Sequence, residues 1–110
     1  MSFDRRSPCP VACTLDLIGD KWTLLIVRDL YLGKQHFGEF QQSPEGIATN
    51  ILTNRLSRLV EAGLVEKFPS PQQSRREAYR LTEKGKTLLP IVKAIMEWGL
   101  KHVEGTKTFD

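Results

Sequence analysis

The chain has no long apolar run, which bears on membrane insertion and on export. A helix needs roughly 20 apolar residues to cross a bilayer. The longest apolar stretches, residues 22–27 and 88–95, are too short or are interrupted by proline and lysine. The amino terminus carries Asp4, Arg5 and Arg6 and lacks the apolar region of a signal peptide. We therefore expect a cytoplasmic protein without a membrane partner.

Cysteine and histidine are also scarce, with two of each in the chain. Cysteines of cytosolic proteins are rarely joined in a structural disulfide. A structural metal site needs about four ligands, and nothing brings His36 and His102 toward the cysteines. The sequence has no phosphate-binding glycine loop, no nucleophile elbow and no metal-binding histidine pair on a helix. It therefore predicts a protein that is not an enzyme and that needs no metal or cofactor.

The charge of the chain is unevenly distributed. The 110 residues, 40% hydrophobic and 26% charged, predict one folded domain over residues 1–110, with a formal net charge of +3. Residues 1–54 carry 5 basic and 6 acidic groups, whereas residues 55–80 carry 6 basic and 3 acidic groups. Five of those six basic residues are arginine, the side chain best shaped to grip phosphate or guanine. The excess favours an anionic partner for this segment.

Most of the chain has the apolar periodicity of helices. Asp20 can cap the second helix and Thr82 the last, whereas Pro90 must either kink the last helix or mark a late start. A tight turn at 43–46 joins the third and fourth helices, which is a helix-turn-helix pattern. The expected helices span residues 10–18, 21–32, 37–42, 49–62 and 82–103.

The expected helix at 49–62 has one apolar side and one side of small polar residues. Asn, Thr and Ser are poorer helix formers than the Lys and Glu of an ordinary solvated helix surface, so solubility alone does not explain their presence here. Short amide and hydroxyl groups can bond to base edges in a DNA major groove, and Asn can bond bidentately to adenine. The apolar side consists of Leu52, Leu56, Leu59 and Val60. The candidate DNA contacts are Thr49, Asn50, Thr53, Asn54, Ser57 and Arg58.

Arg55 lies at the edge of this polar side and is a further candidate. Its guanidinium can hold either a DNA phosphate or a carboxylate of the protein itself. The sequence leaves both roles open.

A hairpin is expected after the fourth helix. Strands predicted at 64–68, with Val65 pointing inward, and at 78–81 flank a loop at 69–76 whose two prolines exclude regular structure. Arg75 and Arg76 in this loop are candidate phosphate or minor-groove contacts, because a narrow groove attracts arginine. The alternative is that they keep an exposed hairpin from aggregating.

The last helix has more apolar surface than one small core requires. One stripe can dock onto the core, and the adjoining stripe then has no obvious partner. Burying it against a second copy is the usual solution, since a two-fold dimer uses one patch twice. The alternative is that the first helix covers it within one chain. The candidate dimer residues are Val11, Leu15, Leu89, Val92, Met96, Leu100 and Val103.

Cys9 is expected at the opening of the first helix. The helix dipole there can lower the pKa of a thiol and favour the reactive thiolate. The alternative is a small apolar side chain without redox chemistry, and we expect that role for Cys13, one turn further on.

Several ordered motifs resemble the HxlR-type winged-helix transcription regulators. The resemblance covers roughly residues 9–100, while the wing tip at 70–74 and Cys13 depart from the usual pattern. It implies a mainly α fold with a small β-hairpin wing, and a dimeric DNA-binding regulator that pairs through its first and last helices. Some members use a cysteine at the position of Cys9 to sense oxidants or electrophiles. The motifs read CPV at 9–11, LDLIGDKWTLLI at 15–26, FGEF at 37–40, LTNRL at 52–56, GLV at 63–65, YRLTEKG at 79–85 and WG at 98–99.

The sequence therefore predicts a transcription regulator that binds double-stranded DNA as a homodimer on a two-fold site and responds to an oxidant, an electrophile or a small ligand. Its two recognition helices should lie about 34–36 Å apart if they enter successive turns of the major groove. One alternative is a winged helix that binds another protein instead of DNA. Another is a thiol-based redox sensor in which DNA binding is weak.

Overall fold

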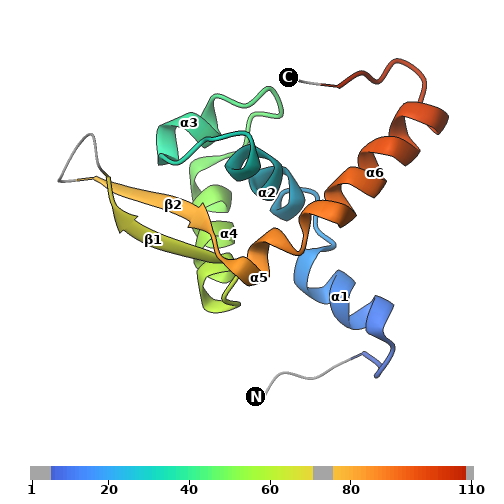
Figure 1. Ribbon diagram of the computed structural model, residues 1–110, viewed down its shortest axis with the longest axis horizontal. Coiled ribbons are helices and arrows are strands. Elements are labelled where there is room, and N and C mark those ends of the chain that lie inside the picture. Colours follow the sequence, from blue (N-terminus) through green and yellow to red (C-terminus); the bar gives the residue numbers. More distant parts are fainter. Residues whose placement is uncertain (1–5, 71–75, 109–110) are drawn as a thin grey trace.

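The computed structural model describes residues 6–70 and 76–108. In Figure 1, the middle helices and the hairpin strands form the body of the molecule, and the first and last helices extend on the other side from the strands. The elements in chain order are α1 (Pro10–Ile18), α2 (Thr23–Tyr31), α3 (Phe37–Gln41), α4 (Thr49–Glu61), β1 (Val65–Pro69), β2 (Glu77–Leu81), α5 (Glu83–Lys86) and α6 (Leu89–His102). Among the described residues, no helix combines the length and the apolar character needed to span a bilayer.

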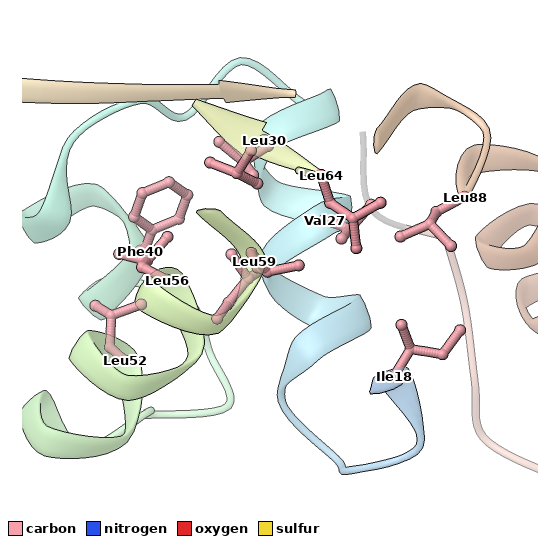
Figure 2. Packing of buried hydrophobic residues seen from close by; sticks show 11 residues of the cluster. Ile18, Val27, Leu30, Phe40, Leu52, Leu56, Leu59, Leu64 and Leu88 are labelled. Carbon is pink, nitrogen blue, oxygen red and sulfur yellow. The ribbon is translucent and has the colours of Figure 1, made fainter. Parts of the chain in front are cut away.

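The core joins α2, α3, α4 and β1. Ile18 and Leu88 lie at the end of this cluster away from Phe40 (Figure 2). Each fully buried leucine stabilises the fold by roughly 1.5–3 kcal/mol relative to an exposed one. Three leucines from the apolar side of α4 take part, so the predicted amphipathic pattern of this helix is confirmed. The buried hydrophobic residues of the cluster are Ile18, Ile26, Val27, Leu30, Phe40, Leu52, Leu56, Leu59, Leu64, Val65 and Leu88.

The two strands pair antiparallel and form the wing. Their register places Val65 opposite Leu81 and Pro69 opposite Glu77. β1 begins and ends one residue later than the expected strand at 64–68, and β2 begins one residue earlier than the expected strand at 78–81. Pro69, which we expected in the loop, is the last residue of β1. A proline is tolerated there because it ends an edge strand and needs no ladder donor.

The start of the second helix and the extent of the last helix differ from the prediction. The second helix begins at Thr23 instead of Lys21, after a turn at residues 21–22, and the Asp20 carboxylate accepts hydrogen bonds from the backbone N–H groups of Trp22 and Thr23. The expected continuous helix over 82–103 is wrong, since it divides into α5 and α6. Pro90 lies in the first turn of α6, so it marks a late start and does not kink a longer helix.

A glycine sets the distance between α5 and the hairpin. Gly85 lies so close to β1 that an added Cβ atom would be 1.9 Å from the Leu64 carbonyl oxygen. The Thr82 hydroxyl caps α5 by accepting a hydrogen bond from the Gly85 N–H at 3.0 Å. The turn from hairpin to last helix therefore depends on the absence of a side chain at Gly85.

Candidate nucleic-acid interface

The polar side of α4 faces solvent. Asn50, Thr53, Asn54 and Ser57 are all exposed, as is Thr49 in the first turn, whereas the leucines on the opposite side are buried. The arrangement follows from the helical period, which separates the two sets of residues by half a turn. The sequence therefore predicted correctly which side of α4 is accessible. That these residues contact DNA stays a prediction.

The amino-terminal turn of α4 is tied to α3 by side chains. Gln41 of α3 donates a hydrogen bond from Nε2 to the Thr49 hydroxyl oxygen at 2.8 Å. The Thr53 hydroxyl donates to the Thr49 backbone carbonyl at 2.9 Å. Because its proton is used within the helix, the Thr53 side chain offers its methyl group and its oxygen lone pairs to the outside. The role of Gln41 was not predicted from the sequence.

A polar network beneath the turn fixes α3 and α4 on α2. The buried Asp29 accepts a hydrogen bond from the Ser43 hydroxyl, whose oxygen lies 2.6 Å from Lys34 Nζ. Arg28 donates to both carboxylate oxygens of Glu45, at 2.9 and 3.0 Å. These bonds from Arg28 lower the pKa of Glu45 against the opposing effect of burial. The turn between α3 and α4 is thus held on α2 by buried and paired polar groups that the sequence pattern did not reveal.

Arg55 is held by a carboxylate of its own chain. Its Nε atom lies 2.8 Å from Asp20 Oδ2, and only 21% of its side chain is exposed. Partial burial would raise the pKa of Asp20, but the hydrogen bonds from Thr23, Arg55 and the Trp22 backbone outweigh it and hold the pKa well below its usual range. Of the two roles that the sequence left open, the structure shows the intramolecular one.

Arg58 reaches the end of α1. Its Nη2 atom donates to the Asp16 backbone carbonyl at 3.4 Å, a weak contact that leaves guanidinium donors for another acceptor. Together with the ion pair between Asp20 and Arg55, this contact connects α4 to both sides of the junction between α1 and α2.

The basic residues of the hairpin are largely paired. Arg80 forms an ion pair with Glu66 and lies over the Phe68 ring at 4.4 Å, and Lys67 lies 3.6 Å from Glu77. The predicted contact Arg75 lies outside the described residues. Arg76 is exposed, and its carbonyl accepts a hydrogen bond from the Ser70 N–H at 2.9 Å. Lys67 and Arg80 are therefore ion-paired on the hairpin surface, with carboxylates that the charge count of residues 55–80 already includes.

The wing is also tied to α3 through His36. This residue precedes the first turn of α3, where Glu39 accepts hydrogen bonds from the backbone N–H groups of Gln35 and His36. These two bonds lower the pKa of Glu39. The His36 ring lies 3.0 Å from Glu39 Oε1 through Nδ1 and 2.8 Å from the Ser70 hydroxyl through Nε2. Through these two contacts His36 holds β1 and the start of α3 together.

α1 and α6 leave their apolar residues uncovered in a single chain. Val11, Leu15 and Ile95 are 66%, 53% and 55% exposed. They line an open groove between the two helices together with Ile18 and Ile91. The first helix therefore does not cover these residues within one chain, and that a second copy covers them stays a prediction.

The faces of α6 differ in part from the expected stripes. Leu89 and Val92 pack against the core, so they belong to the docking side and not to the surplus side. Ile91, Ile95 and Trp98 are exposed and were not among the predicted interface residues. The expected residues Val11, Leu15, Met96, Leu100 and Val103 are exposed.

Cys9 is the amino-terminal cap residue of α1, and its side chain is exposed. The backbone N–H groups of Ala12 and Val11 lower the pKa of its thiol, as expected for sulfur at a helix amino terminus. Cys13 is half-buried, and its Sγ atom lies 3.3 Å from the Ser7 carbonyl oxygen. The two cysteines thus differ in accessibility, in the direction that the sequence predicted.

The order of the elements defines the class of protein. A helix-turn-helix formed by α3 and α4, followed by an antiparallel hairpin and a carboxyl-terminal helix, is a winged helix-turn-helix fold (Figure 1). The chain belongs to the HxlR-like helix-turn-helix family, whose model matches residues 17–107. The predicted family and fold class are confirmed. The family consists of transcription regulators, which are not enzymes.

Relatives with similar sequences are named as transcription regulators. The HTH-type transcriptional regulator Mb3122 of Mycobacterium bovis is 39% identical over 93 residues, which are 84% of this chain and 58% of the relative. YdeP of Bacillus subtilis is 36% identical over 101 residues, covering 92% of this chain and 79% of the relative. The chain thus spans less than two thirds of the length of its mycobacterial relative.

Solved structures show the same fold. PA1607, a putative transcription factor, superposes with a TM-score of 0.83 at 44% identity and covers 96% of this chain and 72% of its own. The redox regulator HypR in its oxidized form superposes with a TM-score of 0.78 at 38% identity, over 87% of this chain and 99% of HypR. The reduced form of the regulator YodB from B. subtilis superposes with a TM-score of 0.72 at 27% identity, over 92% of this chain and 100% of YodB.

Proposed function

We propose that this chain is one winged-helix domain that binds DNA sequence-specifically as a homodimer on a two-fold operator. Each α4 enters a major groove and reads base edges through its exposed amide and hydroxyl groups. The residues assigned to the groove and its walls are Thr49, Asn50, Thr53, Asn54, Ser57 and Arg58.

The observation that carries the proposal is the composition of the exposed side of α4. Asn50, Thr53, Asn54 and Ser57 are exposed on a helix whose other side packs into the core. Each of these side chains costs helix stability compared with the Lys or Glu of an ordinary solvated surface. Each can also form directional hydrogen bonds with bases. Base reading accounts for both properties, whereas solubility accounts for neither.

Phosphate contacts fall to the arginines at the edges of this surface. Arg58 uses one guanidinium donor in a weak contact and can donate others to a phosphate. Arg76 directly precedes β2 of the wing and follows Arg75 in the sequence. Such contacts fix the position of a protein on the duplex without specifying the sequence. Arg55 is not assigned a phosphate contact, because its Nε atom pairs with Asp20 of the same chain.

The dimer is proposed to form through α1 and α6. These two helices carry uncovered apolar residues and lie on the other side of the molecule from the hairpin strands (Figure 1), so pairing through them would leave the hairpin accessible in both copies. A two-fold axis through this region would repeat the recognition helix at a fixed spacing. The residues assigned to the interface are Val11, Leu15, Ile91, Ile95, Met96, Trp98, Leu100 and Val103, with Leu89 and Val92 supporting them from the core side.

The test is selection of bound fragments from a random duplex pool, followed by titration of the selected duplex at several salt concentrations. A DNA reader enriches a two-fold sequence, and its affinity falls steeply as salt rises because phosphate contacts release counterions. Asn50→Ala should reduce the preference for that sequence without changing the unfolding transition. Lys93→Ala, an exposed change on α6, is the matched control. An unenriched pool would instead favour a winged helix that binds protein.

A second function, thiol-dependent regulation, is favoured by the exposed Cys9 with its lowered pKa. The similarity to a protein named as a redox regulator supports the same assignment. Cys9 lies at the end of α1, and α1 contacts α4 through Asp16 and Arg58. Oxidation or alkylation of Cys9 is therefore proposed to alter how the two copies present α4. The test is release of the selected duplex after treatment with an oxidant or an electrophile, with Cys9→Ser as the resistant control.

A further inference from the structure

The turn before α2 carries an exposed lysine, Lys21, beside the helix to which DNA reading was assigned. We propose that Lys21 binds a backbone phosphate at the edge of the major groove that α4 enters. The inference rests on the DNA-binding function proposed above and extends its surface to a segment that carries none of the residues assigned so far. Such a contact adds affinity without specifying the sequence.

Two contacts place Lys21 along the first half of α4. On one side, Asp20 Oδ2 lies 2.8 Å from Nε of Arg55 in the middle of α4. On the other side, Trp22 lines a small cavity together with Ile47, which precedes α4 by two residues. The Lys21 Nζ atom lies over the Trp22 ring, 5.2 Å from its centroid. Because both chain neighbours of Lys21 adjoin α4 or its entry, the ammonium lies beside the segment from Ile47 to Arg55.

The edge of α4 that Asp20 contacts borders the proposed reading surface. At about 100° per residue, Arg55 and Arg58 fall between the buried leucines and the exposed Asn54. Both arginines are half-buried, which agrees with a position at the edge. A duplex that receives Asn54 in its major groove has one phosphate backbone along this edge, where Lys21 and the remaining donors of Arg58 lie. The two cations are therefore assigned to the same wall of the groove.

The charge of Lys21 is not neutralised by the carboxylates around this edge, because each of them pairs with an arginine. Among the described residues no ion pair involves Lys21, so binding an anion costs it no internal partner. A lysine ammonium acts on phosphate as a point charge. The charge count along the sequence did not indicate Lys21, since residues 1–54 have a net negative charge. The pairs are Asp20 with Arg55, Glu45 with Arg28, and Asp16 with Arg6.

The experiment compares Lys21→Met with the wild-type chain on the selected duplex at several salt concentrations. Met keeps a long unbranched side chain over the Trp22 ring and removes the charge. Each phosphate contact contributes about −0.9 to the slope of log affinity against log salt, so the slope should become shallower by about 0.9 for each copy bound. Between about 50 and 200 mM salt, the variant should therefore lose about threefold less affinity per copy than wild type. A scrambled duplex should show a similar change, because the contact reads no base.

Two matched variants identify charge as the cause. Lys21→Arg keeps a positive charge at this position and should retain the wild-type slope. Lys93→Met removes one exposed lysine from α6 and should also retain it. Lys21 is exposed, so its replacement leaves the core intact, and chemical unfolding of each variant checks this.

The outcomes separate this inference from the function on which it rests. A Lys21→Met slope equal to that of wild type overturns the inference and leaves DNA binding intact. A change that Lys21→Arg or Lys93→Met reproduces also overturns it, because packing on Trp22 or net charge alone would then explain the effect. A wild-type chain that selects no duplex overturns the proposed function, and the inference with it.

Discussion

His36 joins the helix-turn-helix to the wing, because its ring Nε2 lies 2.8 Å from the Ser70 hydroxyl oxygen at the end of β1. A backbone hydrogen bond joins the same two segments, since Tyr79 of β2 donates its N–H to the Gln35 carbonyl at 2.9 Å. The position of the wing beside α4 is therefore set from α3 and not by the hairpin alone.

Replacing His36 should weaken DNA binding through the wing. His36→Ala removes the bond to Ser70, which we expect to cost about 1 kcal/mol of folding stability and to lower affinity similarly for all sequences. Binding of the selected duplex and of a scrambled one, with chemical unfolding, measures both effects. Gln35→Ala is the control, because Gln35 contributes backbone bonds that survive the change. Unchanged affinity in His36→Ala would show that the wing does not depend on this contact.

Gly85 should not tolerate a side chain. Gly85→Ala places a methyl group against the Leu64 carbonyl, and overpacking of this kind typically costs about 1–3 kcal/mol. Gly38→Ala on α3 is the matched control, since an added Cβ there meets nothing within 4 Å. That control should leave stability unchanged or raise it by up to about 1 kcal/mol, because alanine favours helix. Thermal unfolding compares the two, and equal melting temperatures would contradict the close approach of α5 to β1.

A charge placed in the α1–α6 groove should separate the copies without unfolding them. Ile95→Asp introduces a carboxylate at a position exposed in one chain, so the folded protomer accepts it while the proposed interface does not. Sedimentation should show a shift from dimer to monomer. Leu56→Ala, in the core, should instead cost about 2–5 kcal/mol of stability. A wild-type chain that sediments as a monomer at micromolar concentration would refute the interface.

The Cys9 thiol should react faster than an ordinary thiol at neutral pH. In Cys13→Ser, where Cys9 is the remaining cysteine, the alkylation rate should rise through a midpoint below the ordinary pKa of 9.0. The sign follows from the thiolate being the nucleophile, so lowering the pH through this pKa protonates the sulfur and slows the reaction. Cys9→Ser, which retains the half-buried Cys13, should react more slowly. A midpoint equal to that of a small free thiol would exclude activation by the helix.

The local elements were predictable where the signal lies within a few residues. Pro10 and Gly19 delimit α1 as expected, and the period of the leucines identifies the buried side of α4. The start of the second helix was less predictable, because residues 21–22 form a turn before Thr23 and apolar periodicity leaves helix ends uncertain by about one or two residues.

The contacts that orient the site were not predictable, because they join residues far apart in the chain. Arg55 is separated from Asp20 by 35 positions and His36 from Ser70 by 34. A single sequence offers several carboxylates for one arginine, and only the packing of α2 against α4 selects among them. Similarly, a helical wheel shows that α6 has two apolar sides but not the angle at which it crosses the body. Leu89 and Val92, which we predicted for the dimer interface, therefore pack against the core, whereas Ile95, which we did not predict there, is exposed.

α6 contains no buried residue along its 14 positions when one chain stands alone. In the dimer proposed above, contacts with the second copy therefore stabilise α6, and the melting temperature should rise with protein concentration. The cellular concentration of the protein would then affect both its stability and its binding to DNA. At low concentration the dimer would dissociate, which would lower both the occupancy of the operator and the melting temperature.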